Sequence, residues 1–379
     1  MSNETVYDVA IIGGGLAGLS TAIVCARQGQ KVILFEKEQY PFHKVCGEYI
    51  SLESKAFLQE LGLPLEQYDL PQIDTLELSS PNGNCLTQKL PLGGIGISRF
   101  KIDDELAQIA RQLNVFISEG NRVQEVKFEN DHFVILSDNR GSITSRICCG
   151  AFGKRSNLDV KWKRPFIQHQ AGALNNFIGI KYHAALEHPR NVIALHNFRG
   201  GYCGISSIEN GKTCICYLTS AANLKRSNNN IREMEQKILS RNPFLRETFE
   251  NAASLYDKPL TISQISFDRK EQVVDHVIML GDAAGLITPL CGNGMSMALQ
   301  SGKMVSAFIS QYLSGKLTRK AFEQAYTEWW KSVFSKRLFA GRIIQSVFGK
   351  EWMTNTMVAT LKPFPRIVKN IIQQTHGKA

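Results

Sequence analysis

The fold follows from one stretch near the start of the chain, residues 7–36, which reads YDVAIIGGGLAGLSTAIVCARQGQKVILFE. Residues 7–12 and 31–35 are short apolar runs that predict two buried strands. Between them, apolar residues recur from Leu16 to Ala26 at the spacing of one helix face. A strand, a glycine-rich turn, a helix and a second strand inside this length predict a β-α-β unit with parallel strands.

The turn GGGLAG fits the pattern G-x-G-x-x-G through its first, third and sixth positions. The first glycine permits the tight turn, the second lets backbone approach a pyrophosphate, and the third lets helix and strand pack closely. A carboxylate that ends the second strand is suited to accept ribose hydroxyl groups. The motif therefore predicts dinucleotide binding without deciding between NAD and FAD. The candidate cofactor-binding residues of this unit are Gly13, Gly15, Leu16, Ala17, Gly18, Glu36 and Lys37.

The composition indicates a globular protein large enough for two joined domains. The chain has 379 residues, of which 43% are hydrophobic and 21% charged. The 18 residues 9–26 carry no charge, but four glycines interrupt them, so we expect a strand, a turn and a helix rather than a membrane helix. The nine cysteines are odd in number and include no C-x-x-C pair, which predicts reduced thiols in a cytosolic protein.

Most of the positive charge lies at the C-terminal end. The formal net charge is +10, and residues 316–379 hold twelve lysines and arginines against three glutamates. A solvated helical face explains such a run most simply. Peripheral association with an anionic membrane is the alternative, because apolar residues recur at helical spacing from Ile343 to Trp352 beside Arg342 and Lys350. No recognition motif accompanies the charge, so we expect no nucleic-acid partner.

The middle of the chain predicts a second, sheet-rich domain. Hairpins are expected around residues 81–83 and 130–131, and a helix over residues 102–113. Four further runs, at residues 177–185, 192–196, 202–208 and 213–219, read as strands of an antiparallel sheet. A buried strand is expected at residues 277–280, and the pattern beyond Gly315 is helical throughout.

A second glycine-rich motif carries a family resemblance. The residues Leu280-Gly281-Asp282-Ala283-Ala284-Gly285, then Pro289 and Gly292-Asn293-Gly294-Met295, resemble the second fingerprint of the p-hydroxybenzoate hydroxylase-like FAD superfamily. The resemblance implies that FAD is the cofactor, that Asp282 binds its ribityl chain, and that the turn at Gly292 and Gly294 starts a helix aimed at the flavin pyrimidine. Such a helix N-terminus stabilises the negative charge of a reduced flavin.

Two more segments fit that superfamily, one of them imperfectly. Ser98-Arg99-Phe100, followed by Asp103 and Leu106, resembles a segment whose arginine approaches the cofactor, although Arg99 also fits a surface arginine at a helix start. Phe152 stands where the superfamily commonly has an aspartate. Lys154 and Arg155 nearby leave a basic site for a phosphate-bearing donor. Because no second G-x-G-x-x-G is present, we expect NAD(P)H to bind transiently, or a redox protein to deliver the electrons.

The loop HKVCGEYIS, residues 43–51, points to one branch of the superfamily. Lys44-x-Cys46-Gly47 resembles the Lys-x-Cys-Gly-Gly type loop of geranylgeranyl reductase-like enzymes, with Glu48 in place of the second glycine. The resemblance implies that Lys44 lies by the cofactor and that Cys46, Glu48 and Tyr49 are candidates for proton delivery or for shaping the pocket. Packing of Cys46 under the flavin ring is the alternative.

We expect no metal site. The thiols of Cys214 and Cys216 and the rings of His183 and His196 lie on predicted strands and lack a known ligand spacing, which indicates core packing.

The sequence thus predicts an α/β fold with a discontinuous, GR2-like Rossmann-type FAD-binding domain. This domain is expected over residues 1–72, 98–158 and 259–314, the inserted antiparallel substrate sheet over 73–97 and 159–258, and a basic helical region over 315–379. The predicted function is an FAD-dependent oxidoreductase acting on a hydrophobic small molecule such as an isoprenoid, a polyketide or an aromatic compound. Double-bond reduction is the leading hypothesis. A monooxygenase acting on an aromatic or quinol-like ring is the alternative, and a flavin-binding protein without turnover is a third.

Overall fold

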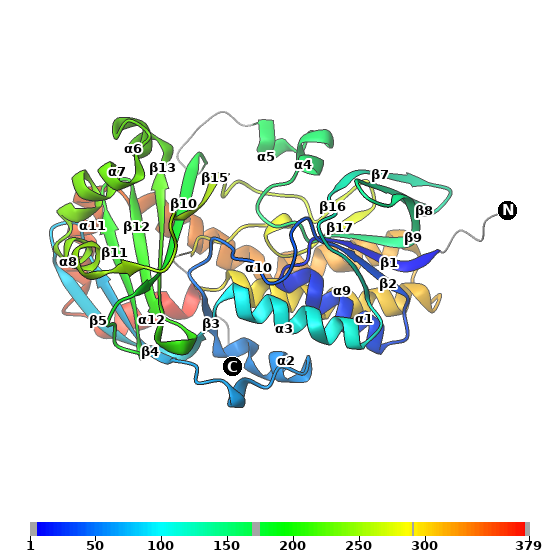
Figure 1. Ribbon diagram of the computed structural model, residues 1–379, viewed down its shortest axis with the longest axis horizontal. Coiled ribbons are helices and arrows are strands. Elements are labelled where there is room, and N and C mark those ends of the chain that lie inside the picture. The colour runs from blue at the N-terminus through cyan, green and yellow to red at the C-terminus, as the bar shows by residue number, and fades with distance from the viewer. Residues whose placement is uncertain (1–5, 169–174, 290–291, 376–379) are drawn as a thin grey trace.

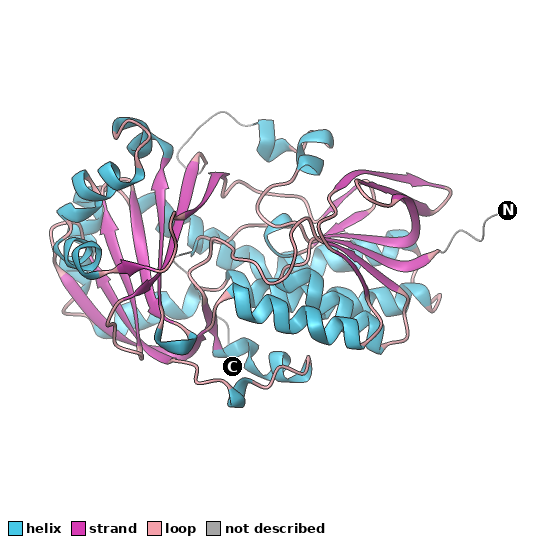
Figure 2. Cartoon of the chain, in the orientation of Figure 1, coloured by secondary structure: helices cyan, strands magenta, loops and turns pink. Residues whose placement is uncertain are grey.

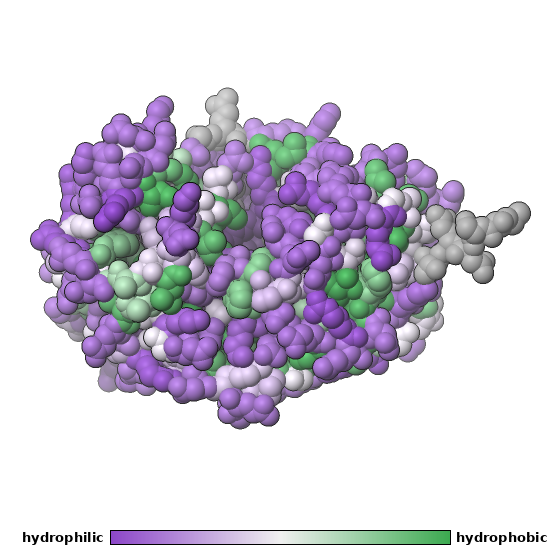
Figure 3. Space-filling model, in the orientation of Figure 1, coloured by the Kyte–Doolittle hydropathy of each residue, from purple (hydrophilic) through white to green (hydrophobic). Residues whose placement is uncertain are grey.

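The computed structural model describes residues 6–168, 175–289 and 292–375. Two β-sheets lie at opposite ends of an elongated molecule, and long helices run between them (Figures 1 and 2). The face seen in Figure 3 is mostly hydrophilic, with hydrophobic residues scattered in small groups. Residues of both sheets line the candidate site.

The first sheet contains the predicted β-α-β unit. Its strand order is β16-β17-β9-β1-β2-β6, with β7 and β8 continuing from β9. The pairs β1–β2, β1–β9, β17–β9 and β2–β6 are parallel, so the carboxyl ends of these strands meet at one edge. The strands are β1 (Tyr7–Ile12), β2 (Val32–Phe35), β6 (Phe116–Ser118), β7 (Val123–Glu129), β8 (His132–Ser137), β9 (Gly141–Gly150), β16 (Val273–Val274) and β17 (Val277–Met279).

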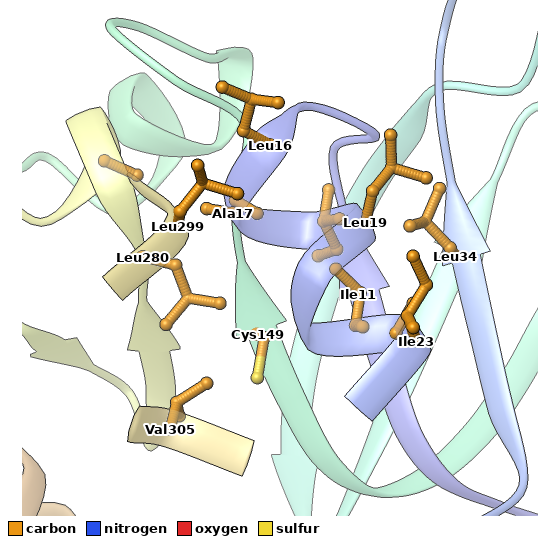
Figure 4. Close-up of a cluster of buried hydrophobic side chains, with 14 of the residues drawn as sticks. Ile11, Leu16, Ala17, Leu19, Ile23, Leu34, Cys149, Leu280, Leu299 and Val305 are labelled. Atoms are coloured by element: carbon orange, nitrogen blue, oxygen red, sulfur yellow. The ribbon is translucent and has the colours of Figure 1, made fainter. Parts of the chain in front are cut away.

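Three helices pack together beside this sheet: α1 (Leu16–Arg27), α3 (Arg99–Gln112) and α9 (Gly294–Leu313). In Figure 4 the side chains of Leu19 and Ile23 on α1 point toward Ile11 and Leu34 on the strands, while Ala17 lies near Leu299 on α9. Helix α1 is therefore buried between the sheet and α9, which explains its nearly uncharged sequence.

Close backbone contacts hold α1 against β1. Gly13 has φ +110°, a conformation that other residues rarely adopt. A Cβ atom at Gly18 would lie 2.0 Å from the carbonyl oxygen of Gly13. The first and last glycines of the motif are therefore required by the fold itself.

The second sheet has nine strands in the order β14-β10-β13-β12-β11-β4-β5-β3, with β15 paired to β10. Its strands are β3 (Tyr49–Ser51), β4 (Gln72–Ser79), β5 (Cys85–Gly96), β10 (Phe177–Ala185), β11 (Val192–Phe198), β12 (Gly201–Ser207), β13 (Thr213–Ser220), β14 (Ala253–Ser254) and β15 (Leu260–Ile265). The sheet is mixed rather than purely antiparallel, because β11 pairs with β4 in parallel. Strands β3 and β15 belong to this sheet, although their residues fell within the ranges predicted for the FAD-binding domain.

Helices cover both faces of the second sheet. One face packs on α7 (Ile231–Lys237) and α8 (Pro243–Asn251), through Met234 and Leu245. The shorter elements are α2 (Lys55–Glu60), α4 (Asn157–Lys161), α5 (Pro165–Gln168), α6 (Ala221–Arg226), and the 3-10 turns η1 (Leu52–Ser54), η2 (Leu65–Gln67), η3 (Glu209–Gly211), η4 (Leu239–Arg241) and η5 (Gly281–Ala283).

The C-terminal region is helical, as predicted: α10 (Arg319–Val347), α11 (Glu351–Leu361) and α12 (Pro365–Thr375). Val358, Val368 and Ile372 of α11 and α12 are buried against leucines of β4 and β5, which covers part of the other face of the second sheet. Among the described residues, none of the helices is long and apolar enough to cross a bilayer.

Candidate cofactor and active site

The two glycine-rich turns meet at the carboxyl edge of the first sheet. One follows β1 and the other follows β17, and both strands flank β9. Gly281 has φ +54°, and a Cβ atom there would lie 3.3 Å from the Cβ of Ala17 and of Ala298. Segments from opposite ends of the chain therefore form one surface, as the Rossmann prediction requires.

The N-terminus of α1 is prepared for an anion. Gly15 is its N-cap, and no side chain caps the first N–H groups. The Arg99 guanidinium and the Lys44 ammonium lie 3.3 and 3.6 Å from the place where a Cβ of Gly15 would stand. Buried Asp103 holds both cations, at 2.7 Å from Arg99 Nη2 and 2.9 Å from Lys44 Nζ. Free N–H groups and two fixed cations at a helix N-terminus suit a pyrophosphate.

These cations set the charge of Asp103. Burial alone would raise the pKa of its carboxyl group, but Arg99 and Lys44 outweigh burial and lower the pKa below its usual value. The residue predicted beside the cofactor arginine is thus the anchor for both cations. Lys44 and Arg99 thus lie beside the glycine turn at the start of α1, and their contact with the cofactor stays a prediction.

The side chains of Glu36 and Lys37, which follow β2, point in different directions. The Glu36 side chain is buried, and its Oε2 accepts a hydrogen bond of 2.9 Å from the Gly14 backbone N–H. The carboxylate therefore borders the glycine turn, where a ribose was predicted. The Lys37 side chain is exposed and pairs with Glu38 at 3.7 Å, so it points away from the turn.

Asp282, in the turn after β17, fits the predicted ribityl contact. Its half-buried carboxylate accepts no hydrogen bond from any residue that the structure describes. Burial raises its pKa, and Lys154, Lys270 and Arg99 oppose that rise. An acceptor that is surrounded by cations and lacks a protein donor is suited to ligand hydroxyl groups.

The turn before α9 also has unused polar atoms. The N–H of Gly292 donates to Pro289 O at 2.9 Å, and Met295 in the first turn of the helix is buried. A Cβ at Gly292 would lie 3.0 Å from the ring of Tyr49. Within the described chain, the buried hydroxyls of Tyr49 and Ser296 have no hydrogen-bond partner. Because Asn293 provides no side-chain cap to α9, this turn offers several polar groups to the edge of a flavin ring.

Phe152 has replaced the acid expected in the middle of the chain, and its ring packs near Trp162 and against Gly150. Lys154 Nζ lies 3.3 Å from the Val45 carbonyl, whereas Arg155 is exposed. The Lys154 ammonium therefore contacts the loop that carries Cys46.

Glu48 forms a buried charge cluster that the sequence did not predict. The side chains of Glu48 and Lys181 are fully buried and form an ion pair. Glu48 Oε2 lies 2.5 Å from His183 Nε2, and Oε1 also accepts from the Arg99 backbone N–H at 2.8 Å. Burial would raise the pKa of Glu48, but Lys181 and His183 outweigh it and hold the pKa below 4.5, its ordinary value.

The backbone of Glu48 has a conformation that is unusual for a residue with a side chain. Its φ is +57°, in the left-handed region that favours glycine. This conformation costs about 1 kcal/mol of backbone strain relative to glycine, and it places a carboxylate between α3, β10 and the Cys46 loop.

A chain of hydrogen bonds leads outward from this cluster. The Tyr256 hydroxyl lies 2.6 Å from His183 Nδ1 and 2.9 Å from His43 Nδ1, and His43 stacks on Phe100. Burial and the Lys181 ammonium lower the pKa of His43 to about 4, so its ring is neutral at pH 7. This chain of hydrogen bonds was difficult to predict from the sequence, because His43, His183 and Tyr256 lie far apart in it.

The cluster also brings together three residues of metal-ligating type. Ligand atoms of Glu48, His183 and Cys214 lie within 4.8 Å of one another. However, the Lys181 ammonium already occupies one oxygen of Glu48, and burial raises the pKa of the Cys214 thiol well above its usual value. The arrangement therefore fits a hydrogen-bonded charge network better than a metal centre.

Cys46 faces an incompletely covered part of the second sheet. Its carbonyl accepts from Cys214 Sγ at 3.4 Å, and the Gly47 carbonyl accepts from Ser206 Oγ at 3.1 Å. Gly204 and Cys216 are paired across neighbouring strands on the same sheet face and are only partly buried, as is Cys46. Cys291 lies outside the described residues.

Comparisons with known proteins agree with this site. Residues 8–44 match the model of the FAD binding domain family. Conditioned medium factor receptor 1 of Dictyostelium discoideum is 24% identical over 91% of this chain and 71% of its own length. A digeranylgeranylglycerophospholipid reductase of Methanococcus vannielii is 24% identical over 88% of this chain and 85% of its own length.

Solved structures show the same fold. The flavin-dependent brominase Bmp2 matches with a TM-score of 0.78 and 20% identity, over 98% of this chain and 93% of its own. A geranylgeranyl bacteriochlorophyll reductase-like protein of Thermoplasma acidophilum matches with a TM-score of 0.78 and 16% identity, over 98% and 96% of the two chains. The predicted Rossmann-type fold and the FAD cofactor are confirmed.

The glycine turn can be tested by a matched pair of substitutions. Gly18→Ala should lower the free energy of unfolding by about 2 kcal/mol or more, because the new methyl group meets the Gly13 carbonyl. Gly15→Ala should leave the apoprotein stable, because its methyl group meets the Arg99 side chain at 3.3 Å, but should weaken FAD binding. Urea unfolding and flavin fluorescence titration measure the two effects. Equal stability of Gly18→Ala and wild type would contradict this account of the turn.

The Glu48 cluster predicts a pH-dependent stability. Glu48→Gln leaves the Lys181 ammonium buried without its partner, which should cost about 3 kcal/mol at pH 7. Because the pKa of Glu48 is lower in the folded than in the unfolded chain, its stabilisation is present above pH 4.5 and is lost as the pH falls through the folded value. Urea unfolding should therefore show the difference between variant and wild type shrinking below pH 4.5.

Two further variants control this prediction. Glu233→Gln removes an exposed i, i+4 pair with Lys237 and should change stability by less than about 0.5 kcal/mol. Glu48→Gly relieves the left-handed backbone but should still be less stable than wild type, since the charge penalty exceeds the strain. A Glu48→Gly variant more stable than wild type at pH 7 would show that the ion pair is not stabilising.

Proposed function

We propose that this FAD-dependent oxidoreductase reduces a carbon–carbon double bond in a hydrophobic small molecule of the isoprenoid type. The supporting observation is the loop Lys44-x-Cys46-Gly47, which lies on the second sheet directly beside the buried hydrogen-bond network of Glu48. The fold does not distinguish reduction from halogenation, because the brominase and the reductase-like structure match with the same TM-score of 0.78. The residues around Cys46 therefore carry the proposal.

FAD, when bound, supplies a two-electron carrier that passes a hydride to the substrate. The residues that would hold its pyrophosphate are Lys44, Arg99 and the N-terminus of α1. Asp282 would accept from the ribityl hydroxyls, and the turn at Gly292 would support the ring edge. Tyr49, whose buried hydroxyl has no hydrogen-bond partner among the described residues, would supply a further donor at this turn.

The part of the second sheet around Gly204 suits an apolar substrate. Gly204 has no side chain, and a Cβ there would meet nothing closer than 3.6 Å. Cys46 and Cys216 border it with soft, weakly polar sulfur atoms. An alkene or an aromatic ring can lie over this surface without leaving a buried polar group unpaired.

A hydrogen-bond network connects half-exposed His43 to the same loop. Charged Glu48 can only accept, so His183 Nε2 donates to it, and His183 Nδ1 then accepts from the Tyr256 hydroxyl. The Tyr256 oxygen in turn accepts from His43 Nδ1–H. Every donor points inward, from half-exposed His43 toward Glu48. A proton taken up at His43 would thereby reach the Glu48 carboxylate, which lies in the same loop as Cys46.

NAD(P)H is the proposed electron donor, with a redox protein as the alternative. Lys154 and Arg155 are the cations available to its phosphates. An oxygen-dependent halogenase or monooxygenase is the second candidate function, and the similarity to the brominase favours it.

Anaerobic turnover separates the two candidates. Protein reduced without oxygen should convert an isoprenoid lipid, such as the digeranylgeranylglycerophospholipid named in the archaeal relative, into a product two hydrogens heavier per double bond. Mass spectrometry of the extracted lipid measures this product. Product that forms only with oxygen, or only with added bromide, would refute the reductase proposal.

Gly204 can be tested by a graded series. Gly204→Ala should leave KM nearly unchanged, because one methyl group fits at 3.6 Å from its neighbours. Gly204→Leu should raise KM about tenfold or more by filling the substrate surface, at unchanged FAD content. Steady-state kinetics and the flavin absorption spectrum measure both. Equal KM values for the two variants would place the substrate elsewhere.

A further inference from the structure

The C-terminal helices expose large apolar side chains that the cofactor site does not use. Among the described residues, twelve large hydrophobic side chains are exposed, and six of them fall between residues 339 and 371. We call these six the apolar stripe: Phe339, Ile343, Trp352, Phe364, Ile367 and Ile371. Half of the exposed apolar side chains thus occur in one short part of the chain, which isolated surface residues do not explain.

Helix α12 has two apolar sides. Val368 and Ile372 are buried against the second sheet and hold the helix in place. Phe364, Ile367 and Ile371 follow one another at i, i+3 and i+7 and are 52%, 48% and 37% exposed. The fold therefore needs only the inner side, and the outer side is left for another contact. Helix α10 packs on α12 and adds Phe339 and Ile343, one turn apart.

Uncompensated cations flank the apolar stripe. From residue 331 to the end, the chain has nine lysines and arginines and a single acid, Glu351. Six of these cations lie in described segments and form no ion pair within the described chain: Lys331, Lys336, Lys350, Lys362, Arg366 and Lys369. Their charge is therefore available to an anionic partner.

A surface depression of about 570 Å³ lies at the start of α11, where Arg199 and Lys350 stand beside Trp352 and a single acid, Glu351. The backbone N–H of Gly200 donates to Gly349 O at 2.9 Å, so this corner is fixed to the turn between β11 and β12. Two cations next to an exposed indole suit a lipid headgroup, since tryptophan favours the membrane–water interface. The depression connects the apolar stripe to the substrate sheet.

We propose that the apolar stripe and its flanking cations dock the protein on an anionic lipid bilayer. An amphipathic helix with apolar residues on one side and lysines and arginines beside them is the usual form of an interfacial anchor. A second copy of the chain is disfavoured as the occupant, because a symmetric contact would bring the same cations together. With 11 residues, α12 is too short to span a bilayer and lies on it instead.

Vesicle binding by the full-length holoprotein tests the proposal. Co-sedimentation should be strong with phosphatidylcholine vesicles containing phosphatidylglycerol, at least tenfold weaker with phosphatidylcholine alone, and reduced by salt. Binding should shift tryptophan emission to shorter wavelength, because Trp352 is 72% exposed in the free protein. Trp352→Phe should abolish the shift while retaining binding.

A double variant identifies the surface. Ile367→Ser with Ile371→Ser should lower vesicle affinity at least tenfold at unchanged circular dichroism and FAD content. The matched control, Leu136→Ser with Leu255→Ser, removes side chains that are 43% and 48% exposed elsewhere and should bind as wild type. Equal binding by the double variant and wild type, or equal binding to both vesicle types, would overturn the proposal. So would concentration-dependent dimerisation that the double variant abolishes. None of these measurements requires turnover, so a failure of the reductase proposal would not affect them.

Discussion

The contact between Gly18 and the carbonyl group of Gly13 is the constraint on which the cofactor site depends. A methyl group at Gly18 would stand 2.0 Å from that oxygen, so only glycine lets α1 lie this close to β1. The close approach sets the N-terminus of α1 at the carboxyl edge of the sheet. The second turn then packs on it through Gly281 and Ala17. The shape of the cofactor surface is therefore set by the backbone of these turns. The side chains of Arg99, Lys44 and Asp282 give that surface its charge.

Glu48 is the residue that fixes the Cys46 loop between the two sheets. Its carboxylate joins the N-terminus of α3, strand β10 of the second sheet and the loop that carries Cys46. A buried ion pair is weak evidence for stability, because desolvating two charges offsets most of their attraction. The hydrogen bonds from Arg99 N and His183 make the buried pair net stabilising, because they satisfy the remaining acceptor positions of Glu48. This loop is consequently held in one position relative to both the phosphate cations and the substrate sheet.

The sequence was sufficient for the parts of the molecule that depend on local spacing. The two glycine motifs, the β-α-β unit and the hairpins depend on neighbouring residues, and each was predicted from a short window. The Glu48 network was missed because its members come from separate loops and strands. One signal was present: Lys181 and His183 alternate along an otherwise apolar strand, which indicates a polar patch on one sheet face. Strands β3 and β15 were not predicted, and their residues were placed in the range of the FAD-binding domain, because the pairing partners of a strand are not local in sequence. Lys37 was included because it follows Glu36, but its side chain faces solvent.

The second sheet connects the two proposals. The same face of this sheet carries the loop of Cys46, the surface at Gly204 and the leucines of β4 and β5 that pack against the buried side of α12. The outer side of α12 bears Ile367 and Ile371 of the apolar stripe. A hydrophobic substrate is concentrated in lipid and scarce in water, so an enzyme that acts on it benefits from a fixed attachment to the lipid surface. The corner at Gly349, bonded to the β11–β12 turn, is a second contact between that attachment and the sheet. Since Gly204 lies on β12 itself, the strand that begins at this corner also carries the proposed substrate surface.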